Sequence, residues 1–151
     1  MKKSVKSRIL VIHGPNLQLL GKREKGIYGT CTLKNINDSL RKEASKHNID
    51  LKIIQSNSEE KIINAITNLD YNFLLINPAA YTHTSVAIRD ALLATGKPSI
   101  EVHLSNIYKR EDFRKKSLTS DIVIGVIAGL GKLSYLLALH AAISLIKHPK
   151  Q

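Results

Sequence analysis

Polar side chains that can bind or protonate a small molecule are concentrated at residues 77–90, directly after the apolar run 73–76. This segment contains an amide, an imidazole, several hydroxyl groups and a carboxylate, which are groups able to hold a ligand and transfer protons. Open α/β sheets bind ligands at the carboxyl ends of their strands. Similar polar segments follow two other apolar runs, at residues 13–16 and 103–106. We therefore expect three loops to form one composite site.

Two glycine-containing segments resemble phosphate-binding loops, but neither has the required pattern. Residues 14–21 lack the three-glycine dinucleotide fingerprint, and Pro15 removes an N–H group that a pyrophosphate would need. Residues 129–134 are similar to a P-loop, but Leu133 stands where the metal-binding hydroxyl belongs. We interpret these glycines as positions where the chain turns tightly into a helix.

Metal binding and serine hydrolysis are two further possibilities. Histidines follow three apolar runs and could converge on a metal ion, but none has helical His-x-x-x-His spacing: His13, His83 and His103. We expect His13 to be a buried structural residue, whereas the polar context of His83 and His103 favours a functional role. Ser-His-Asp hydrolysis through Ser85 or Ser105 stays an alternative, although no Gly-x-Ser-x-Gly elbow is present.

The hydrophobic pattern alternates short strands with helices. Apolar runs predict strands at residues 9–12, 49–54, 73–76, 99–102 and 122–127. Apolar positions three and four residues apart predict helices at 33–44 (capped by Thr32), 62–69, 85–94 and 132–147. Such alternation is typical of a parallel sheet with helices on both faces. We expect the two long polar connections, 14–30 and 104–120, to be functional, because loops of that length are uncommon in compact domains.

Composition limits the class of protein. The 151 residues are expected to form a single domain, residues 1–151, and 43% of them are hydrophobic. The 23 Lys and Arg residues outnumber the 12 Asp and Glu residues but are scattered, and five Tyr, two Phe and no Trp make a stacking platform for nucleic acid improbable. We expect attraction of an anionic metabolite instead. The single Cys31 indicates a reducing cytoplasm, and no apolar run predicts a signal peptide or membrane span.

Several motifs follow one another along the chain, at residues 14–17, 21–24, 27–29, 55–57, 77–85, 100–106 and 110–114. Taken together, they resemble those of the type II 3-dehydroquinate dehydratases, and the resemblance runs from about residue 9 to residue 139. The resemblance implies a flavodoxin-like three-layer α/β sandwich with a five-stranded parallel sheet. It also implies a homododecamer of four trimers, with neither metal nor organic cofactor, that dehydrates 3-dehydroquinate to 3-dehydroshikimate in the shikimate pathway.

The resemblance assigns roles to individual residues. It implies Tyr28 as the catalytic base, Arg23 as its activator and His103 as the acid, with Asn16 positioning a water near the enolate oxygen. Substrate contacts are implied for five residues: Asn77, His83, Leu104, Ser105 and Arg114. Asp90 is implied to reach the site of a neighbouring subunit.

A tyrosine base requires electrostatic help. The free phenol has a pKa near 10, so ionisation at pH 7 must be favoured by about 3 units, or roughly 4 kcal/mol. One guanidinium about 4 Å away supplies something near 4 kcal/mol at an effective dielectric of 20, before desolvation is subtracted. Arg23 alone is therefore marginal, whereas Arg23 together with Arg114 would be sufficient. The segment 21–29 has glycine at both ends, and we expect it to act as a lid.

The chain departs from the family pattern at four positions, none of which is assigned chemistry: His13, Gln18, Leu118 and Ser134. No lysine follows a predicted strand within the three polar clusters, so a free enolate and anti elimination are expected rather than a Schiff base. The alternative reading is a non-catalytic flavodoxin-like module that binds a small molecule or regulates a partner.

Overall fold

The structure is a computed structural model that describes residues 5–22 and 25–149. Within these residues, five strands form one sheet: β1 (Arg8–His13), β2 (Asp50–Gln55), β3 (Phe73–Asn77), β4 (Ser99–His103) and β5 (Gly125–Ala128). All neighbouring strands are parallel, and their order is β2-β1-β3-β4-β5. This is the order of flavodoxin-like sheets. The predicted fold class is confirmed.

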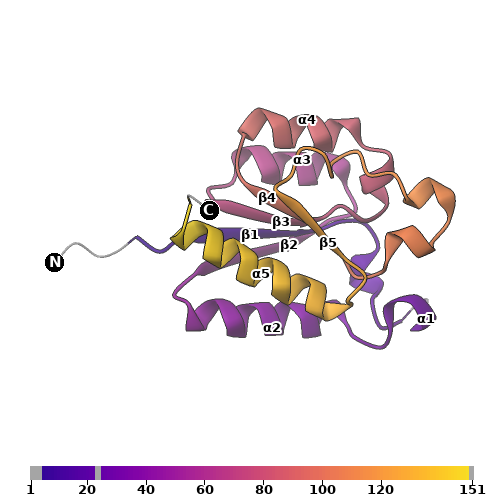
Figure 1. The fold of residues 1–151 in the computed structure, drawn as a ribbon, viewed down its shortest axis with the longest axis horizontal. Coiled ribbons are helices and arrows are strands. Elements are labelled where there is room, and N and C mark those ends of the chain that lie inside the picture. The colour runs from indigo at the N-terminus through magenta and orange to yellow at the C-terminus, as the bar shows by residue number, and fades with distance from the viewer. Residues whose placement is uncertain (1–4, 23–24, 150–151) are drawn as a thin grey trace.

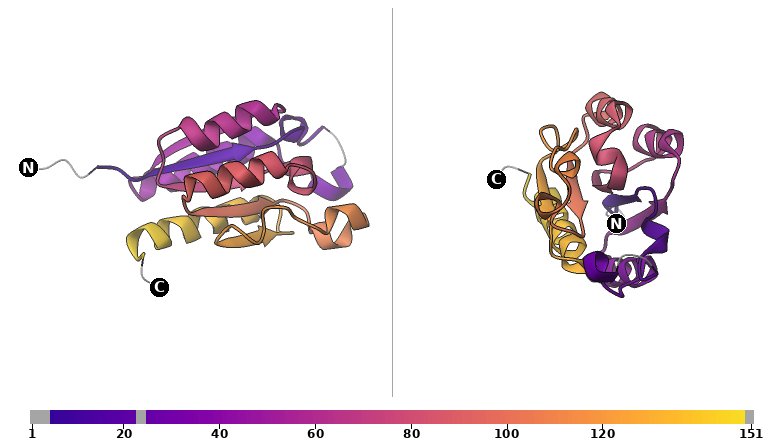
Figure 2. Two further views of the ribbon diagram at one scale, coloured as in Figure 1. Left: turned by 90° about the horizontal axis from the view of Figure 1, so that it is seen from above. Right: turned by 90° about the vertical axis from the view of Figure 1, so that its right-hand side faces the viewer.

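Helices cover both faces of the sheet: α2 (Leu33–Lys46) and α5 (Lys132–Lys147) lie on one face, and α3 (Glu59–Asn68) and α4 (Val86–Thr95) on the other (Figures 1 and 2). The two faces follow from the alternation of side chains along a strand. In β1, Ile9 and Val11 pack toward α2 and α5, whereas Leu10 and Ile12 pack toward α3 and α4. Both faces of the central strands are buried, so these strands are mainly apolar. Their buried polar residues include Glu101 in β4, and His13, Asn77 and His103 at the strand ends.

Three of the four predicted helices begin at a hydroxyl cap, and one of these caps, Thr32, was predicted from the sequence. The Thr32 hydroxyl accepts a hydrogen bond from the Asn35 backbone N–H at 3.1 Å, and the Asn35 side chain accepts one from the Thr32 N–H at 3.0 Å. This reciprocal pair is a capping box, and it confirms the predicted start of α2. The hydroxyl groups of Ser58 and Ser85 cap α3 and α4 by accepting a hydrogen bond from the backbone N–H three residues on, without the reciprocal bond.

The last strand is shorter than the sequence predicts. The apolar run 122–127 was expected to be one strand, but β5 begins only at Gly125. Ile122 and Val123 instead pack against the core that α3 and α4 cover, and Ile124 is exposed. An apolar run without regular alternation does not show whether its residues form a strand or a loop packed against the core. The prediction was therefore wrong by three residues at this end.

The two long connections contain short helices. The first holds η1 (Leu17–Leu19) and α1 (Lys25–Tyr28), and the second holds η3 (Ile107–Lys109) and η4 (Asp112–Arg114). A further short helix, η2 (Ala79–His83), follows β3. The violet α1 and the orange segment with η3 and η4 lie at the same end of the sheet (Figure 1). None of the helices in the described part of the chain is long and apolar enough to cross a membrane.

Candidate active site

A cavity of about 100 Å³ opens at the carboxyl ends of β1, β3 and β4, where the three polar clusters meet. This is the position at which open parallel sheets bind ligands. Seven of the ten residues assigned to the site from the sequence line it: Asn16, Asn77, His83, His103, Leu104, Ser105 and Arg114. The three strand ends expected to meet therefore border a single cavity.

The loop after β1 is held tightly against β3. The Gly14 N–H donates to the Asn77 carbonyl at 2.8 Å, and a Cβ atom on Gly14 would lie 2.5 Å from the Pro78 carbonyl oxygen. No other residue type fits there without movement of the backbone. The chain then places Asn16 in the left-handed region, at φ 69°, with its N–H donating to Asn57 Oδ1 at 3.0 Å. Asparagine tolerates this backbone conformation better than most residues.

A buried chain of hydrogen bonds orients Asn77. The Asn77 amide donates to the Tyr135 hydroxyl at 3.0 Å, and that hydroxyl lies 2.9 Å from His13 Nδ1. His13 Nε2 lies 2.8 Å from Asn37 Oδ1, an acceptor, so the proton of a neutral His13 is on Nε2 and Tyr135 donates to Nδ1. Asn77 Oδ1 accepts from the Ala79 N–H at 3.0 Å. Both ends of the amide are therefore assigned, and the remaining amide hydrogen is available to a ligand.

Burial keeps this chain uncharged. His13 is fully buried, and the loss of hydration lowers its pKa to about 4, against a smaller raising effect of the Asn37 hydrogen bond. Burial also raises the pKa of Tyr135 far above its usual value. His13 is therefore the structural residue that we expected, with side chains rather than backbone groups as its partners.

His103 is paired with a buried carboxylate. Its Nε2 donates to Glu101 Oε1 at 2.6 Å, and Glu101 also accepts from the hydroxyl groups of Ser117 and Thr119. Burial would raise the pKa of Glu101, but the hydrogen bonds from these three donors outweigh it and hold that pKa below its usual value. Glu101 is therefore a fixed negative charge that orients the ring. Nδ1 is the ring nitrogen left for a ligand.

His83 and two arginines complete the polar wall. His83 Nδ1 donates to the Lys116 carbonyl at 2.7 Å, which leaves Nε2 as the acceptor, and burial lowers the pKa of this ring. Arg114 donates from Nε to Glu111 at 2.8 Å while its side chain lines the cavity. Arg110 also lines the cavity and was given no role from the sequence. Its position four residues before Arg114 was the signal that could have identified it.

The lid segment is only partly described. Arg23 lies outside the described residues, and the side chain of Tyr28 is not described either, so the structure does not place the expected base or its activator. Helix α1, which ends at Tyr28, borders a second hollow of about 480 Å³ through Gly26 and Ile27. This hollow shares Leu104, Ser105 and Arg110 with the first cavity, so the two adjoin.

Two other residues considered from the sequence lie apart from the cavity. Asp90 is exposed on α4 and does not line the cavity. Ser85 is buried, and its hydroxyl accepts from the Ile88 N–H at 2.9 Å as the cap of α4. That role as a cap argues against a nucleophilic Ser85.

The comparisons with known proteins agree on one family. The model of the family described as dehydroquinase class II matches residues 7–143. The 3-dehydroquinate dehydratase of Shewanella woodyi is 51% identical over 146 residues, covering 97% of this chain and 98% of its own. That of Francisella philomiragia is 55% identical over 138 residues, covering 91% and 95%.

A solved structure gives the same result in three dimensions. The type II dehydroquinase from Propionibacterium acnes superimposes with a TM-score of 0.88 at 42% identity, covering 92% of this chain and 97% of that one. The match extends over the strands and loops that build the cavity, since it covers nearly the whole chain. The family match, the sequence relatives and the solved structure all agree. This chain therefore belongs to the class II dehydroquinase family.

Proposed function

We propose that this chain dehydrates 3-dehydroquinate to 3-dehydroshikimate, the step of the shikimate pathway that leads toward chorismate and the aromatic amino acids. The observation that carries the proposal is the His103–Glu101 pair at the wall of a small polar cavity, in a member of a dehydroquinase family. The reaction removes a proton next to a ketone and expels a hydroxyl group, so it needs a base, a stabilised enolate oxygen and an acid.

Tyr28 is the proposed base, and Arg23 lowers the cost of ionising it. Tyr28 as phenolate takes the proton beside the ketone and leaves an enolate. Asn16, at the cavity wall, positions a water that donates to the enolate oxygen. Arg114 adds a second positive charge at the cavity wall. This second charge is needed because ionisation of the phenol at pH 7 costs roughly 4 kcal/mol, and one guanidinium supplies only about that much before desolvation.

His103 is the proposed acid. With Nε2 held by the Glu101 carboxylate, a ring protonated on both nitrogens presents Nδ1–H to the departing hydroxyl group. The leaving group takes this proton and departs as water, while the enolate electrons form the new carbon–carbon double bond. Base and acid on opposite faces of the substrate ring give anti elimination. The reaction needs no lysine adduct.

The remaining groups bind the polyhydroxylated, anionic substrate. The free amide hydrogen of Asn77 can donate to a ring hydroxyl group, and His83 Nε2 can accept a hydrogen bond from another. The backbone N–H groups of Leu104 and Ser105, together with Arg114, are matched to the substrate carboxylate. Closure of segment 21–29 over the adjoining hollow would exclude water during the reaction.

The test is direct. The purified chain is mixed with 3-dehydroquinate, and the ultraviolet absorbance of the conjugated enone is followed. Tyr28→Phe keeps the ring and removes the oxygen, so kcat should fall by two or more orders of magnitude, the general scale for a lost base. Arg23→Ala should have a similar effect while substrate still binds. Retention of more than about a tenth of the activity in Tyr28→Phe would show that the base is another residue.

The free enolate is separated from a lysine Schiff base by trapping. Borohydride added with substrate should leave activity intact and add no mass to the chain. A covalent adduct on any lysine, found together with inactivation, would contradict the mechanism. The non-catalytic alternative predicts binding of 3-dehydroquinate without any enone absorbance, and the same assay tests it.

We also propose that the chain assembles as four trimers. Helix α4 exposes Val86, Asp90 and Leu93 at positions i, i+4 and i+7, one stripe of a helix that could pack on a neighbour and bring Asp90 to its cavity. Strand β5 lies at an open edge of the sheet.

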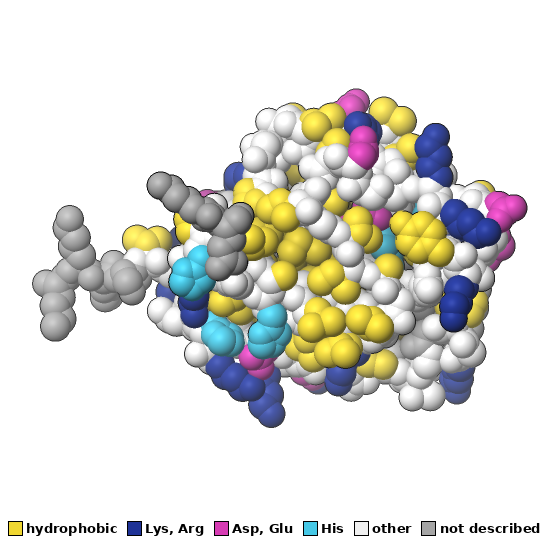
Figure 3. Space-filling model, viewed as in Figure 1, with side chains coloured by type: hydrophobic (Ala, Val, Ile, Leu, Met, Phe, Trp, Pro, Cys, Tyr) yellow, Lys and Arg dark blue, Asp and Glu magenta, His cyan; other side chains and the backbone are white. Residues whose placement is uncertain are grey.

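Exposed apolar side chains lie on and beside β5 and on α5: Ile124, Val126, Leu130, Leu133 and Leu137. Figure 3 shows hydrophobic side chains gathered on the face that β5 and α5 form. Contiguous exposed apolar surface beside an unpaired edge is characteristic of an interface between chains.

A cytoplasmic location is proposed because the sequence has a single cysteine and cannot form an internal disulfide.

A further inference from the structure

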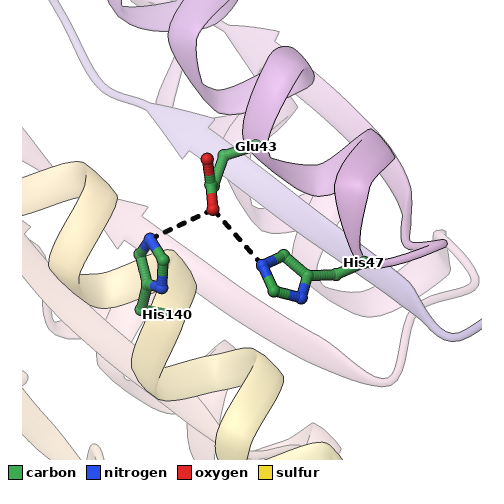
Figure 4. Close-up of side chains that lie close together, drawn as sticks. All are labelled: Glu43, His47 and His140. Carbon is green, nitrogen blue, oxygen red and sulfur yellow. Dashed lines mark hydrogen bonds and ion pairs between the residues drawn. The ribbon is translucent and has the colours of Figure 1, made fainter.

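Three potential metal ligands come together where α2 packs against α5. Glu43 and His47 are four residues apart at the end of α2, and His140 faces them from α5 (Figure 4). Glu43 Oε1 lies 3.2 Å from His47 Nε2 and 3.4 Å from His140 Nε2. One ligand atom from each residue lies within 4.8 Å of the other two.

These separations are those of donor atoms around a tetrahedral ion. Zn²⁺ binds histidine nitrogen and carboxylate oxygen at about 2.0–2.2 Å, which places two donors of a tetrahedron about 3.3 Å apart. The two measured contacts of Glu43 Oε1 lie close to that value. The third separation, between the ligand nitrogens of the two imidazoles, is at most 4.8 Å. The rings stand nearly perpendicular, at 78°, with centroids 6.0 Å apart, so rotation of the exposed His140 ring can bring its nitrogen inward.

The carboxylate oxygen that contacts both histidines, Glu43 Oε1, is available to bind a metal ion. Lys46 binds the other oxygen of the carboxylate, Oε2, at 2.8 Å. The three side chains are 17%, 32% and 53% exposed for Glu43, His47 and His140, so an ion can enter from solvent and water can complete its coordination. Two imidazoles and one carboxylate are a ligand set that suits Zn²⁺ among the common divalent ions.

The cluster lies far from the catalytic cavity in the fold. Helix α2 runs back from the carboxyl edge of the parallel sheet, so its last turn, with Glu43 and His47, lies at the opposite edge. Figure 1 shows this end of α2 on the side of the molecule away from α1, and the contact of Glu43 with His140 places it against α5. An ion here would not contact the substrate.

We propose that Glu43, His47 and His140 form a structural binding site for one divalent transition-metal ion, with Zn²⁺ as the best match, that cross-links α2 to α5. Each histidine binds through Nε2 and carries its proton on Nδ1 in the bound state. Water occupies the fourth position. The ion stabilises the folded chain because the two helices are fixed to one another only in that state.

The competing reading is that Glu43 simply accepts ordinary hydrogen bonds from surface side chains. The two readings differ in what a metal titration shows. Protein first treated with a chelator is titrated with ZnCl₂ in a calorimeter, and one ion per chain should bind. His140→Ala, His47→Ala and Glu43→Gln should each weaken binding at least tenfold.

The matched control is His148→Ala, which removes an exposed histidine just beyond the end of α5 and outside the cluster. It should bind Zn²⁺ as the unaltered chain does. Co²⁺ in place of Zn²⁺ should give the intense visible absorption of a tetrahedral site, and this absorption should disappear in His140→Ala. Equal affinity for Zn²⁺ in His140→Ala and the unaltered chain would overturn the proposal, as would equal losses in His140→Ala and His148→Ala.

Two further measurements bear on the structural role. Zn²⁺ at about one hundred times its dissociation constant should raise the melting temperature by about 5–10 °C in the unaltered chain and in His148→Ala, but not in His140→Ala. Conversion of 3-dehydroquinate should be unchanged by the chelator. Loss of turnover on chelation would contradict a purely structural ion, and this result is independent of whether the proposed mechanism is correct.

Discussion

At the scale of single residues, the site depends on how completely each reactive group is held by its neighbours. The ring of His103 is fixed through one nitrogen by a buried carboxylate that has two further hydroxyl donors. Asn77 is fixed through both ends of its amide. Groups that are held this way do not have to be ordered when substrate binds, which is the physical basis of a preorganised site.

Replacement of Glu101 should show whether this residue positions the His103 ring or contributes to substrate binding. Glu101→Gln keeps the size of the side chain and removes the charge that holds the His103 ring, so kcat should fall by about tenfold or more with little change in KM. His103→Ala removes the acid itself and should lower kcat further. Steady-state kinetics of the two variants measure both effects. A Glu101→Gln enzyme with normal kcat would show that the carboxylate has no part in the reaction.

Stability should depend on pH through His13. Burial lowers its pKa to about 4 in the folded chain, below the ordinary value of 6.5, so the unfolded chain binds the proton more readily between these values. Stability is therefore lost as pH falls from about 6.5 toward 4. From pH 7 to pH 5 the loss is about 2 kcal/mol, at 1.36 kcal/mol per pKa unit.

The measurement is the melting temperature at pH 7 and at pH 5, for the unaltered chain and for His13→Asn. The unaltered chain should lose about 5 °C more than the variant over this interval. His83, whose pKa is also lowered by burial, contributes to both proteins, so the difference between them isolates His13. Equal pH dependence in the two proteins would show that His13 is not buried in a neutral form.

At the scale of elements, the cavity exists because three parallel strands end at the same edge and each continues into a polar loop. The loops are held by contacts between them as well as by their own turns. Gly14 bonds to the carbonyl of Asn77, and the Tyr81 hydroxyl bonds to the carbonyl of Asn57 at 2.7 Å. The strand ends thereby fix the relative position of Asn16, Asn77 and His83.

Gly14→Ala tests this arrangement. The added Cβ would lie 2.5 Å from the Pro78 carbonyl oxygen, so the backbone at Gly14 or at Asn77 and Pro78 has to move. We expect a loss of about 1–3 kcal/mol in stability together with a fall in kcat/KM, because Asn16 and Asn77 are displaced. Gly125→Ala is the matched control, since a Cβ there has nothing within 4 Å. Chemical denaturation and the enone assay measure the two effects, and a normal kcat/KM in Gly14→Ala would mean that the contact does not position the site.

At the scale of the whole molecule, two of the exposed apolar surfaces in the described part of the chain bear on assembly. One is the stripe on α4 that contains Asp90, and the other is the edge formed by β5 and the start of α5. An open sheet edge with apolar side chains favours association with another chain. The two surfaces lie on different elements, which is what an assembly of trimers into a larger closed particle requires.

Sedimentation of the purified chain tests the assembly. Twelve chains of 16.8 kDa would form a particle of about 200 kDa. Asp90→Ala should sediment as the unaltered protein does but show a lower kcat/KM, since its carboxylate is proposed to act in a neighbouring site. Val126→Lys places a charge on the β5 edge and should yield smaller particles. A monomer with full activity would contradict the shared site.

The pattern of the sequence determined most of the fold. Alternating apolar strands and amphipathic helices predicted the parallel sheet, and hydroxyl residues before apolar runs marked helix starts such as Thr32. These signals are local, so they can be read without knowledge of distant contacts. The resemblance of separate motifs identified the family and named half of the residues that line the cavity. The start of β5 was misplaced because an apolar run does not show whether it pairs with a strand or covers a helix.

Only the tertiary structure decided which polar residues are partners. His13, Tyr135 and Asn77 are separated by up to 122 positions, and no spacing in the sequence connects them. Glu101 lies two residues before His103, yet its role depends on hydroxyl groups from residues 117 and 119. Glu43 and His47 have helical spacing, but their third partner is on α5. Periodicity records which face of an element is buried, whereas these contacts depend on how elements pack, and that is determined only when the chain has folded.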